Sequence, residues 1–427
     1  MGLDGYNFAL PQGTGVAAYG RGLSRSLQRL GLCVDVVWGL NIPDGGDPLA
    51  RETAFFDPPG EGRRRNLVNT ARDWAAGLRG LTGGVPAPEL RLSGAMVAEP
   101  LRDRLPAFDR LWNAKRLFHL SHGVFDATGR RMRVRVADPP AVMHWTYPLA
   151  LELVGARNIY TLHDLVPLKL PYTTLDRKAR YLRLARMLAR EADHIVTVSD
   201  CSRRDIVELL GADPARVTST HQVVEPPPAR PPGEAEALVR NGAGLEPGGY
   251  FLFVGAIEPK KNVGRLLQAY FAADLDTPLV LAGKAAWKSE EELALLRHAG
   301  GAGGRGRVLR LDYVPRALLE ALVRCARAVT FPSLYEGFGL PVAEALSVGT
   351  PVLTSNTSSL PEVAGDAALS VGPYDVPALT AALRRLDGDA ELRAELSRRG
   401  PLQAARFAPA AIDARLASLY RGLGVAV

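Results

Sequence analysis

Cysteine is scarce in this chain of 427 residues, and its three copies, Cys33, Cys201 and Cys325, lie far apart. Scattered thiols exclude a disulfide framework and a cysteine-based zinc site, and they favour a reducing, cytoplasmic setting. No segment reaches the roughly eighteen apolar residues without charge that suggest a membrane-spanning helix. The opening stretch MGLDGYNFALPQGTG has neither a basic start nor a long apolar run, so we expect no signal peptide.

Several chemical signatures are missing as well. No Asp-x-Asp pair or His/Cys cluster has a convincing metal-ligand spacing, so we expect no divalent metal and no other cofactor. The sequence lacks a Gly-x-Ser-x-Gly elbow, and no glycine loop ends in Gly-Lys-Ser/Thr. Zinc-finger, RNP and basic-tail patterns are also missing, so nucleic acid is not an expected partner. The formal charge of +7 fits an anionic small molecule or lipid head group, and an arginine-rich genome explains it equally well.

What the chain does contain is a repeated alternation of short β-branched runs with Leu/Ala-rich periodic segments, which predicts parallel α/β structure. An edge-like strand is expected near residues 2–10, and clearer strands follow up to residue 198. Proline then dominates at 225–232, and we predict an interdomain linker over 225–248. A second α/β unit starts at Tyr250. The fold class is therefore α/β with two Rossmann-like, doubly wound domains facing a cleft: 1–224, and 249–405.

In such folds, ligands bind beyond the carboxyl ends of the strands. The stretch FPSLYEGFGLPVAEALSVGTPV (331–352) places Glu336 before a Gly-Phe-Gly turn and a helix. Gly337 and Gly339 allow close approach of the backbone, and the amides of 338–340 suit an oxyanion or a sugar hydroxyl. Glu336 and Glu344 would then bind the diols of a sugar nucleotide. Alternatively, Glu336 is a turn residue and Glu344 compensates the helix dipole from the first turn.

Three other loops follow strands or open helices. FVGAIEPKKNVGRLLQAY (253–270) carries Lys260 and Lys261, which are either a diphosphate clamp or solvated charges, and then Asn262 as a helix cap. IYTLHDLVPLKLPY (159–172) places His163 and Asp164 after a strand, in a site wall or a plain turn. The glycine loop GTGVAAYGRGL (13–23) opens a helix. Ser199 is expected chiefly as a helix cap.

The segment DRKARYLRLARMLARE (176–191) is basic and amphipathic, with an apolar stripe of Tyr181, Leu184 and Leu188. Such a helix either lies on an anionic membrane surface or packs on its own domain with its arginines in water.

The stretch from Pro332 to Val352, followed by SNTSSLPEVAGDAAL (355–369), resembles the retaining glycosyltransferases of family 4, also called group 1, which have the GT-B fold. Their hallmark is two glutamates separated by seven residues, matched by Glu336 and Glu344. The resemblance covers almost the whole chain and is strongest over 248–400. It implies that the segment from about 406 crosses back onto the N-terminal domain.

The resemblance implies that Glu336 holds the donor sugar, Glu344 the nucleotide ribose and Lys261 the diphosphate. Many relatives carry an arginine where this chain has Ala256, and it stays open whether Lys260 replaces that charge. The residues expected for catalysis are His163, Lys261 and Glu336. The residues expected for donor binding are Gly13, Gly15, Gly255, Lys260, Lys261, Val314, Gly337, Phe338, Gly339, Leu340 and Glu344.

The implied reaction is configuration-retaining transfer of a hexose, for instance mannose, from a GDP- or UDP-type sugar donor to a hydroxyl. The expected acceptor is a lipid-linked or growing surface polysaccharide, reached in the cytoplasm or at the inner face of the membrane. Two alternatives remain: a GT-B sugar-nucleotide isomerase or epimerase, and a non-catalytic sugar-nucleotide-binding protein.

Overall fold

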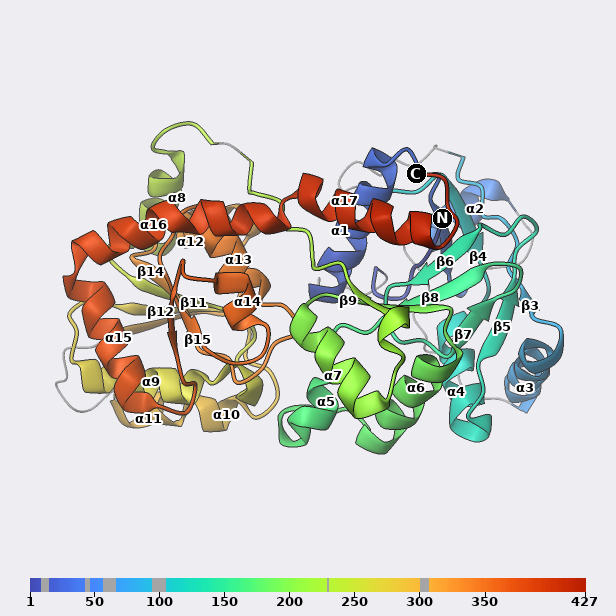
Figure 1. Ribbon diagram of the computed structural model, residues 1–427, viewed down its shortest axis with the longest axis horizontal. Helices are drawn as coiled ribbons and strands as arrows, with labels where there is room; N and C mark the ends of the chain where they lie inside the picture. Colours follow the sequence, from blue (N-terminus) through green and yellow to red (C-terminus); the bar gives the residue numbers. More distant parts are fainter. Residues whose placement is uncertain (9–14, 43–46, 57–66, 94–104, 229, 300–306) are drawn as a thin grey trace.

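Two parallel sheets, each flanked by helices, lie side by side along the long axis of the molecule (Figure 1). The predicted α/β class with two Rossmann-like units is confirmed. Among the described residues, no helix is long and apolar enough to cross a membrane. The computed structural model describes residues 1–8, 15–42, 47–56, 67–93, 105–228, 230–299 and 307–427.

The N-terminal half is built on a seven-stranded parallel sheet in the order β10-β9-β8-β6-β1-β2-β4, with a small three-stranded sheet, β3-β5-β7, beside it. Most strands of the large sheet are buried along their whole length, as expected where helices cover both faces. The strands are β1 (Gly2–Asp4), β2 (Asp35–Trp38), β3 (Val85–Pro86), β4 (Arg110–Asn113), β5 (Met132–Arg135), β6 (Val142–Trp145), β7 (Leu151–Leu153), β8 (Arg157–Thr161), β9 (His194–Thr197) and β10 (Val217–Ser219). The helices are α1 (Gly15–Arg29), α2 (Pro48–Phe56), α3 (Leu67–Thr82), α4 (Leu117–Thr128), α5 (Val166–Lys169), α6 (Lys178–Glu191) and α7 (Asp200–Leu210).

The expectation of an edge-like strand at 2–10 is wrong. Strand β1 pairs with β6 on one side and β2 on the other, so it lies in the middle of the sheet. Asp4 tolerates this burial because its carboxylate accepts hydrogen bonds from the backbone N–H groups of Tyr6 and Thr146. Satisfied polar groups of this kind can be buried.

The C-terminal half contains a six-stranded parallel sheet in the order β13-β12-β11-β14-β15-β16. Its central strands are apolar and fully buried, which fits their sequence pattern. The strands are β11 (Phe251–Val254), β12 (Leu279–Ala282), β13 (Val308–Leu311), β14 (Ala328–Phe331), β15 (Val352–Ser355) and β16 (Leu369–Val371). The helices are α8 (Glu234–Ala243), α9 (Val263–Ala273), α10 (Ser289–Glu292), α11 (Ala294–Ala299), α12 (Arg316–Cys325), α13 (Leu340–Ser347), α14 (Leu360–Ala364), α15 (Val376–Gly388), α16 (Ala390–Ala404) and α17 (Pro409–Gly422).

Two segments connect the halves. The stretch 225–248 contains helix α8, which packs against α12 of the C-terminal half. At the other end of the chain, α17 returns to the N-terminal half and lies along α1 (Figure 1). Arg29 of α1 binds Asp413 of α17 through two hydrogen bonds of 2.6 and 2.9 Å, and the Tyr420 hydroxyl lies 2.8 Å from Nδ1 of buried His144.

Helix α6 buries its apolar stripe within its own half. Leu184 and Leu188 belong to the N-terminal core, and Tyr181 packs against it. Arg180 is held by an ion pair with Asp126 on α4. The apolar face is therefore not available for insertion into a bilayer, and the remaining basis for membrane contact is electrostatic.

The contact between Tyr420 and His144 predicts a stability change. Burial lowers the pKa of His144 to about 3, so the ring is neutral, and Tyr420→Phe would leave its Nδ1 without a partner. We expect the free energy of unfolding to fall by about 1–3 kcal/mol, the usual cost of an unsatisfied buried polar group. Urea denaturation measures this change. Tyr313→Phe is the control, because Tyr313 is 88% exposed; equal losses in the two variants would contradict the account.

Candidate active site

Loops from the two halves meet closely at the carboxyl ends of β8 and β14. His163 and Asp164 follow β8, and Gly337 follows β14. A Cβ atom at Gly337 would lie 2.9 Å from the His163 carbonyl oxygen and 2.9 Å from Asp164 Oδ2. A glycine is therefore required for this approach. The candidate site belongs to both halves of the chain.

Glu336 is the centre of the charged groups in this region. Its side chain is buried, and its carboxylate lies 2.6 Å from Lys261 Nζ and 3.3 Å from Lys260 Nζ. Burial alone would raise the pKa of Glu336, but the two ammonium groups outweigh it and lower the pKa to about 2. The lysines predicted as either a clamp or solvated charges thus converge on one carboxylate. Lys260 reaches the same place as Lys261.

The lysine loop is held in place by Asn262. This residue occupies the N-cap position of α9, but its side chain makes no capping hydrogen bond to the helix, so the expected capping role is wrong. Its Nδ2 group instead donates hydrogen bonds to the carbonyl oxygens of Pro332, at 2.9 Å, and Pro373, at 2.6 Å. The side chain is used there because the residue adopts a left-handed conformation, with φ of 61°, between two loops. Gly255, at the end of β11, lies close to the aliphatic part of Lys261.

Helix α13 presents free amides beside Glu336. None of the amides of 337–340 donates a hydrogen bond to another residue in the part of the chain that the structure describes. Gly339 has a φ of 104°, a left-handed value that glycine adopts easily, and it is the N-cap of α13. Free N–H groups at a helix N-terminus attract anions. This turn can therefore receive a negatively charged or hydroxyl-bearing group.

Ser358 and Ser359 hold the backbone of the turn at residues 336–340 through their hydroxyl groups. The Glu336 N–H donates to Ser358 Oγ at 3.0 Å. The Ser359 hydroxyl lies 2.9 Å from the Glu336 carbonyl oxygen and 2.8 Å from that of Phe338. Sequence reasoning missed both serines, although SNTSSL directly follows β15 in the same way that the other site loops follow their strands.

His163 is positioned by its contacts within the N-terminal half. Its Nε2 atom donates to the Thr146 carbonyl oxygen at 2.9 Å, and the Tyr19 ring meets it edge-on with ring centroids 4.9 Å apart. Burial lowers the pKa of His163, so the ring is neutral and Nδ1 carries a lone pair. Asp164 accepts the Val166 N–H at 3.0 Å, which orients the loop.

Glu344 lies in the second turn of α13, not in the first as expected, because the helix begins at Leu340. This position weakens the interpretation of Glu344 as a dipole-compensating residue, since that effect is confined to the first turn. The side chain is exposed. Partial desolvation nevertheless raises the pKa of Glu344 to about 7, opposed by Arg316 and reinforced by Glu320.

The remaining predicted residues differ in their placement. Gly15 is exposed at the start of α1, whereas Gly13 lies outside the described residues. The Phe338 side chain is buried against Phe407, so only its backbone is available to a ligand in the turn. Val314 lies just before α12, and Leu340 is the first residue of α13. Both side chains pack on the apolar core. Ser199 caps α7 by accepting the Ser202 N–H, which confirms its expected capping role.

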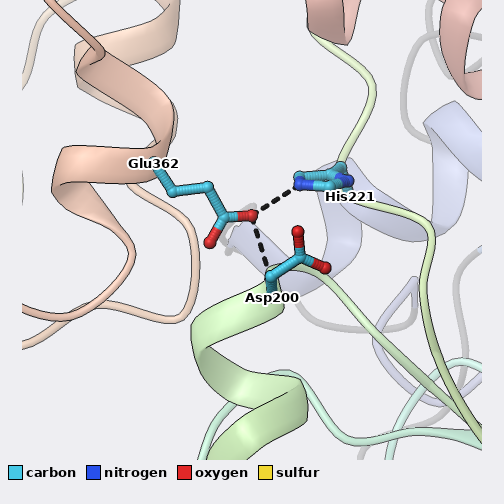
Figure 2. Close-up of side chains that lie close together, drawn as sticks. All are labelled: Asp200, His221 and Glu362. Atoms are coloured by element: carbon cyan, nitrogen blue, oxygen red, sulfur yellow. Dashed lines mark hydrogen bonds and ion pairs between the residues drawn. The ribbon is translucent and has the colours of Figure 1, made fainter.

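One group of side chains in the described ranges has donor atoms close enough for a metal ion. It comprises Asp200, His221 and Glu362, whose ligand atoms all lie within 4.8 Å of one another (Figure 2). However, each Glu362 carboxylate oxygen accepts a hydrogen bond from a backbone N–H group, and His221 Nε2 lies 2.5 Å from Glu362 Oε1. These hydrogen bonds explain the cluster without an ion.

Comparison with sequence families gives two matches that together span most of the chain. The family "Glycosyl transferase 4-like domain" matches residues 14–221, and "Glycosyl transferases group 1" matches residues 240–403. The chain is 36% identical over 258 residues to the O-antigen chain mannosyltransferase B of Escherichia coli, a match that covers 59% of this chain and 66% of that enzyme. It is 29% identical over 405 residues to the MMP alpha-(1->4)-mannosyltransferase of Mycolicibacterium hassiacum, covering 89% and 87%.

Solved structures with the same fold cover nearly the entire chain. Sucrose-phosphate synthase from Thermosynechococcus elongatus superposes with a TM-score of 0.64 at 18% identity, covering 99% of this chain and 98% of that one. Anabaena Alr3699/HepE in complex with UDP and glucose gives the same TM-score at 15% identity, with the same coverage. The family matches and the two facing α/β units lead to one conclusion: the chain belongs to the group 1 glycosyltransferases of family 4 and has the GT-B fold.

Proposed function

We propose that the protein transfers a hexose, mannose in the first instance, from a GDP- or UDP-type donor to a hydroxyl with retention of configuration. The observation that carries this proposal is the convergence of Lys260 and Lys261 on Glu336, beside the free amides of 337–340. Such a cluster offers cations for a diphosphate and a carboxylate for sugar hydroxyls. The names of the two mannosyltransferases favour mannose, and the family resemblance favours retention.

The proposed chemistry relies on positioning and electrostatics. The leaving diphosphate develops negative charge, which the lysines and the N-terminus of α13 stabilise. Glu336 exchanges its lysine partners for hydroxyls of the donor sugar, and Glu344 accepts hydrogen bonds from the ribose. The incoming hydroxyl approaches on the face from which the phosphate leaves and transfers its proton to a phosphate oxygen. Nδ1 of neutral His163 accepts a hydrogen bond from the sugar.

The proposed acceptor is a lipid-linked or growing surface polysaccharide, in line with the name of the O-antigen chain mannosyltransferase of Escherichia coli. Contact with the inner face of the membrane would use exposed arginines such as Arg186 and Arg190. Two competing functions are sugar-nucleotide isomerisation and sugar-nucleotide binding without turnover. Release of free GDP or UDP only when a hydroxyl acceptor is present distinguishes transfer from both.

Glu336→Gln tests the role of the central carboxylate. We expect kcat to fall at least a hundredfold, because a charge-assisted hydrogen bond to the sugar is lost in an otherwise similar site, on the scale of about 10² for one preorganised group. Affinity for GDP or UDP should be retained or increased, because the variant frees both lysines. Steady-state kinetics and calorimetry measure these quantities. Glu391→Gln, an exposed change on α16, is the control, and wild-type kcat/KM in Glu336→Gln would refute the assignment.

Lys261→Ala tests the source of the positive charge. We expect kcat to fall by about 10²–10³-fold. The kcat of Lys260→Ala should fall to a comparable degree if Lys260 replaces the arginine that many relatives carry at the position of Ala256. Because the lysines supply this charge, activity should persist in excess EDTA. Lys288→Ala, on the surface of the same half, is the control. Complete inhibition by EDTA, reversed by Mg²⁺ or Mn²⁺, would overturn the mechanism.

The raised pKa of Glu344 predicts a pH dependence of nucleotide binding. Only the ionised carboxylate accepts both hydrogen bonds of a ribose diol, and a group with a pKa of about 7 is protonated as the pH falls. Affinity for GDP or UDP should therefore drop about tenfold from pH 8 to pH 6. Glu344→Gln should bind GDP or UDP more weakly and should lose this component of the pH dependence. Because the phosphate of the ligand titrates equally in both experiments, the difference between the two proteins reports Glu344 alone. Identical pH profiles in the two proteins would return Glu344 to a structural role.

A further inference from the structure

Glu362 joins the two halves of the molecule. It belongs to α14 of the C-terminal half, but its carboxylate receives its hydrogen bonds from the N-terminal half (Figure 2). Oε1 accepts the Asp200 N–H at 2.9 Å, and Oε2 accepts the Cys201 N–H at 3.2 Å. These amides begin the eleven-residue helix α7, whose dipole favours a negative charge at this end. Ser199 caps the next amide, so the first turn of α7 is completed by a residue from the other half.

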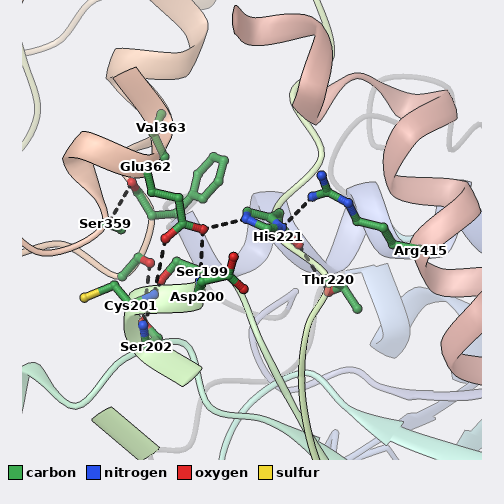
Figure 3. Close-up of polar contacts among 12 residues, drawn as sticks. Ser199, Asp200, Cys201, Ser202, Thr220, His221, Ser359, Glu362, Val363 and Arg415 are labelled. Atoms are coloured by element: carbon green, nitrogen blue, oxygen red, sulfur yellow. Dashed lines mark hydrogen bonds and ion pairs between the residues drawn. The ribbon is translucent and has the colours of Figure 1, made fainter. Parts of the chain in front are cut away.

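His221 extends this contact to α17, the helix that returns to the N-terminal half (Figure 3). Arg415 Nη1 on α17 donates to His221 Nδ1 at 2.5 Å. The ring proton therefore lies on Nε2, which donates to Glu362 Oε1 at 2.5 Å. The His221 ring also packs against Phe407, just before α17, with centroids 5.5 Å apart. Three segments, α7, α14 and the one that carries His221, thus meet at the Glu362 carboxylate, and α17 joins them through His221.

The same short segment that carries Glu362 also holds the turn of residues 336–340, which we call the donor turn. Ser359 is the residue before α14, and its hydroxyl contacts the carbonyl oxygens of Glu336 and Phe338. Ser358 accepts the Glu336 N–H. A displacement of α14 away from α7 would therefore move the backbone of Glu336.

A second contact joins the turn to α7. The Tyr335 hydroxyl donates to Asp205 on α7, and Asp205 also binds Lys169 at 2.5 Å. Loss of Glu362 alone thus loosens the junction without removing every link between the halves. This redundancy makes Glu362 testable by substitution.

We propose that Glu362 is a positioning residue for the transfer reaction, which locks the donor turn against the N-terminal half through α7 and His221. The inference rests on the proposed transferase function. The lysines, the amides of 337–340 and Glu344 all lie in the C-terminal half, so they can bind the nucleotide without this lock. Transfer, however, needs His163 of the other half at the sugar, and small displacements of reacting groups are costly.

Glu362→Gln separates these two requirements. We expect kcat to fall about tenfold, a moderate loss for misplaced reacting groups, whereas the KM for the donor and the Kd for GDP or UDP change less than about twofold. Small-angle X-ray scattering with saturating GDP or UDP should give a larger radius of gyration than for the wild type. Glu391→Gln makes the same charge change at an exposed site of α16 and should leave all four quantities unchanged.

Asp200→Asn distinguishes the lock from a metal site. The lock uses only the backbone N–H of Asp200, so this variant should match the wild type. Equal losses in Asp200→Asn and Glu362→Gln, together with stoichiometric Zn²⁺ binding to the wild type, would overturn the proposal in favour of a metal. An unchanged radius of gyration and kcat in Glu362→Gln would also overturn it. If no donor supports transfer, the proposed function fails, and the scattering comparison alone still decides whether Glu362 locks the halves.

Discussion

The pairing of one buried carboxylate with two lysines determines the design of this site. An ionised Glu336 without a partner would be costly in its buried position, and Lys260 and Lys261 remove that cost. The same groups suit a nucleotide sugar, because phosphates can replace Glu336 as partners of the lysines and sugar hydroxyls can replace the lysines as partners of Glu336. Under the proposed function, the protein therefore keeps these three groups charged and oriented before the donor arrives.

This arrangement works only where the two halves meet. Gly337 touches the His163–Asp164 turn so closely that a side chain would not fit. Contacts that hold the halves together are distributed over α7, α14 and α17, and one of them, from Tyr335 to Asp205 of α7, involves the residue next to Glu336. The contact between the halves and the turn at residues 336–340 are thus parts of one hydrogen-bonded structure, held by Glu362 and Ser359 of one short segment.

Much of this could be predicted from sequence, because it depends on local patterns. The apolar strands of the C-terminal half, the glycine turn after β14 and the lysine loop after β11 all have short-range signals. Other features depend on contacts between distant residues. Lys261 and Glu336 are 75 positions apart, and Glu362 meets α7 across 162 positions. The burial of β1 depends on Asp4 finding Thr146, and the role of Asn262 depends on two loops that no local pattern connects to it.

The central claim concerns where the donor binds, and a crystal structure with GDP or UDP tests it most directly. The account predicts diphosphate oxygens within hydrogen-bonding distance of Lys261 Nζ and of the amides of 337–340, with the ribose against Glu344. Lys261 would then have changed partners from Glu336 to phosphate. A nucleotide bound elsewhere, with both lysines still paired to Glu336, would contradict the account.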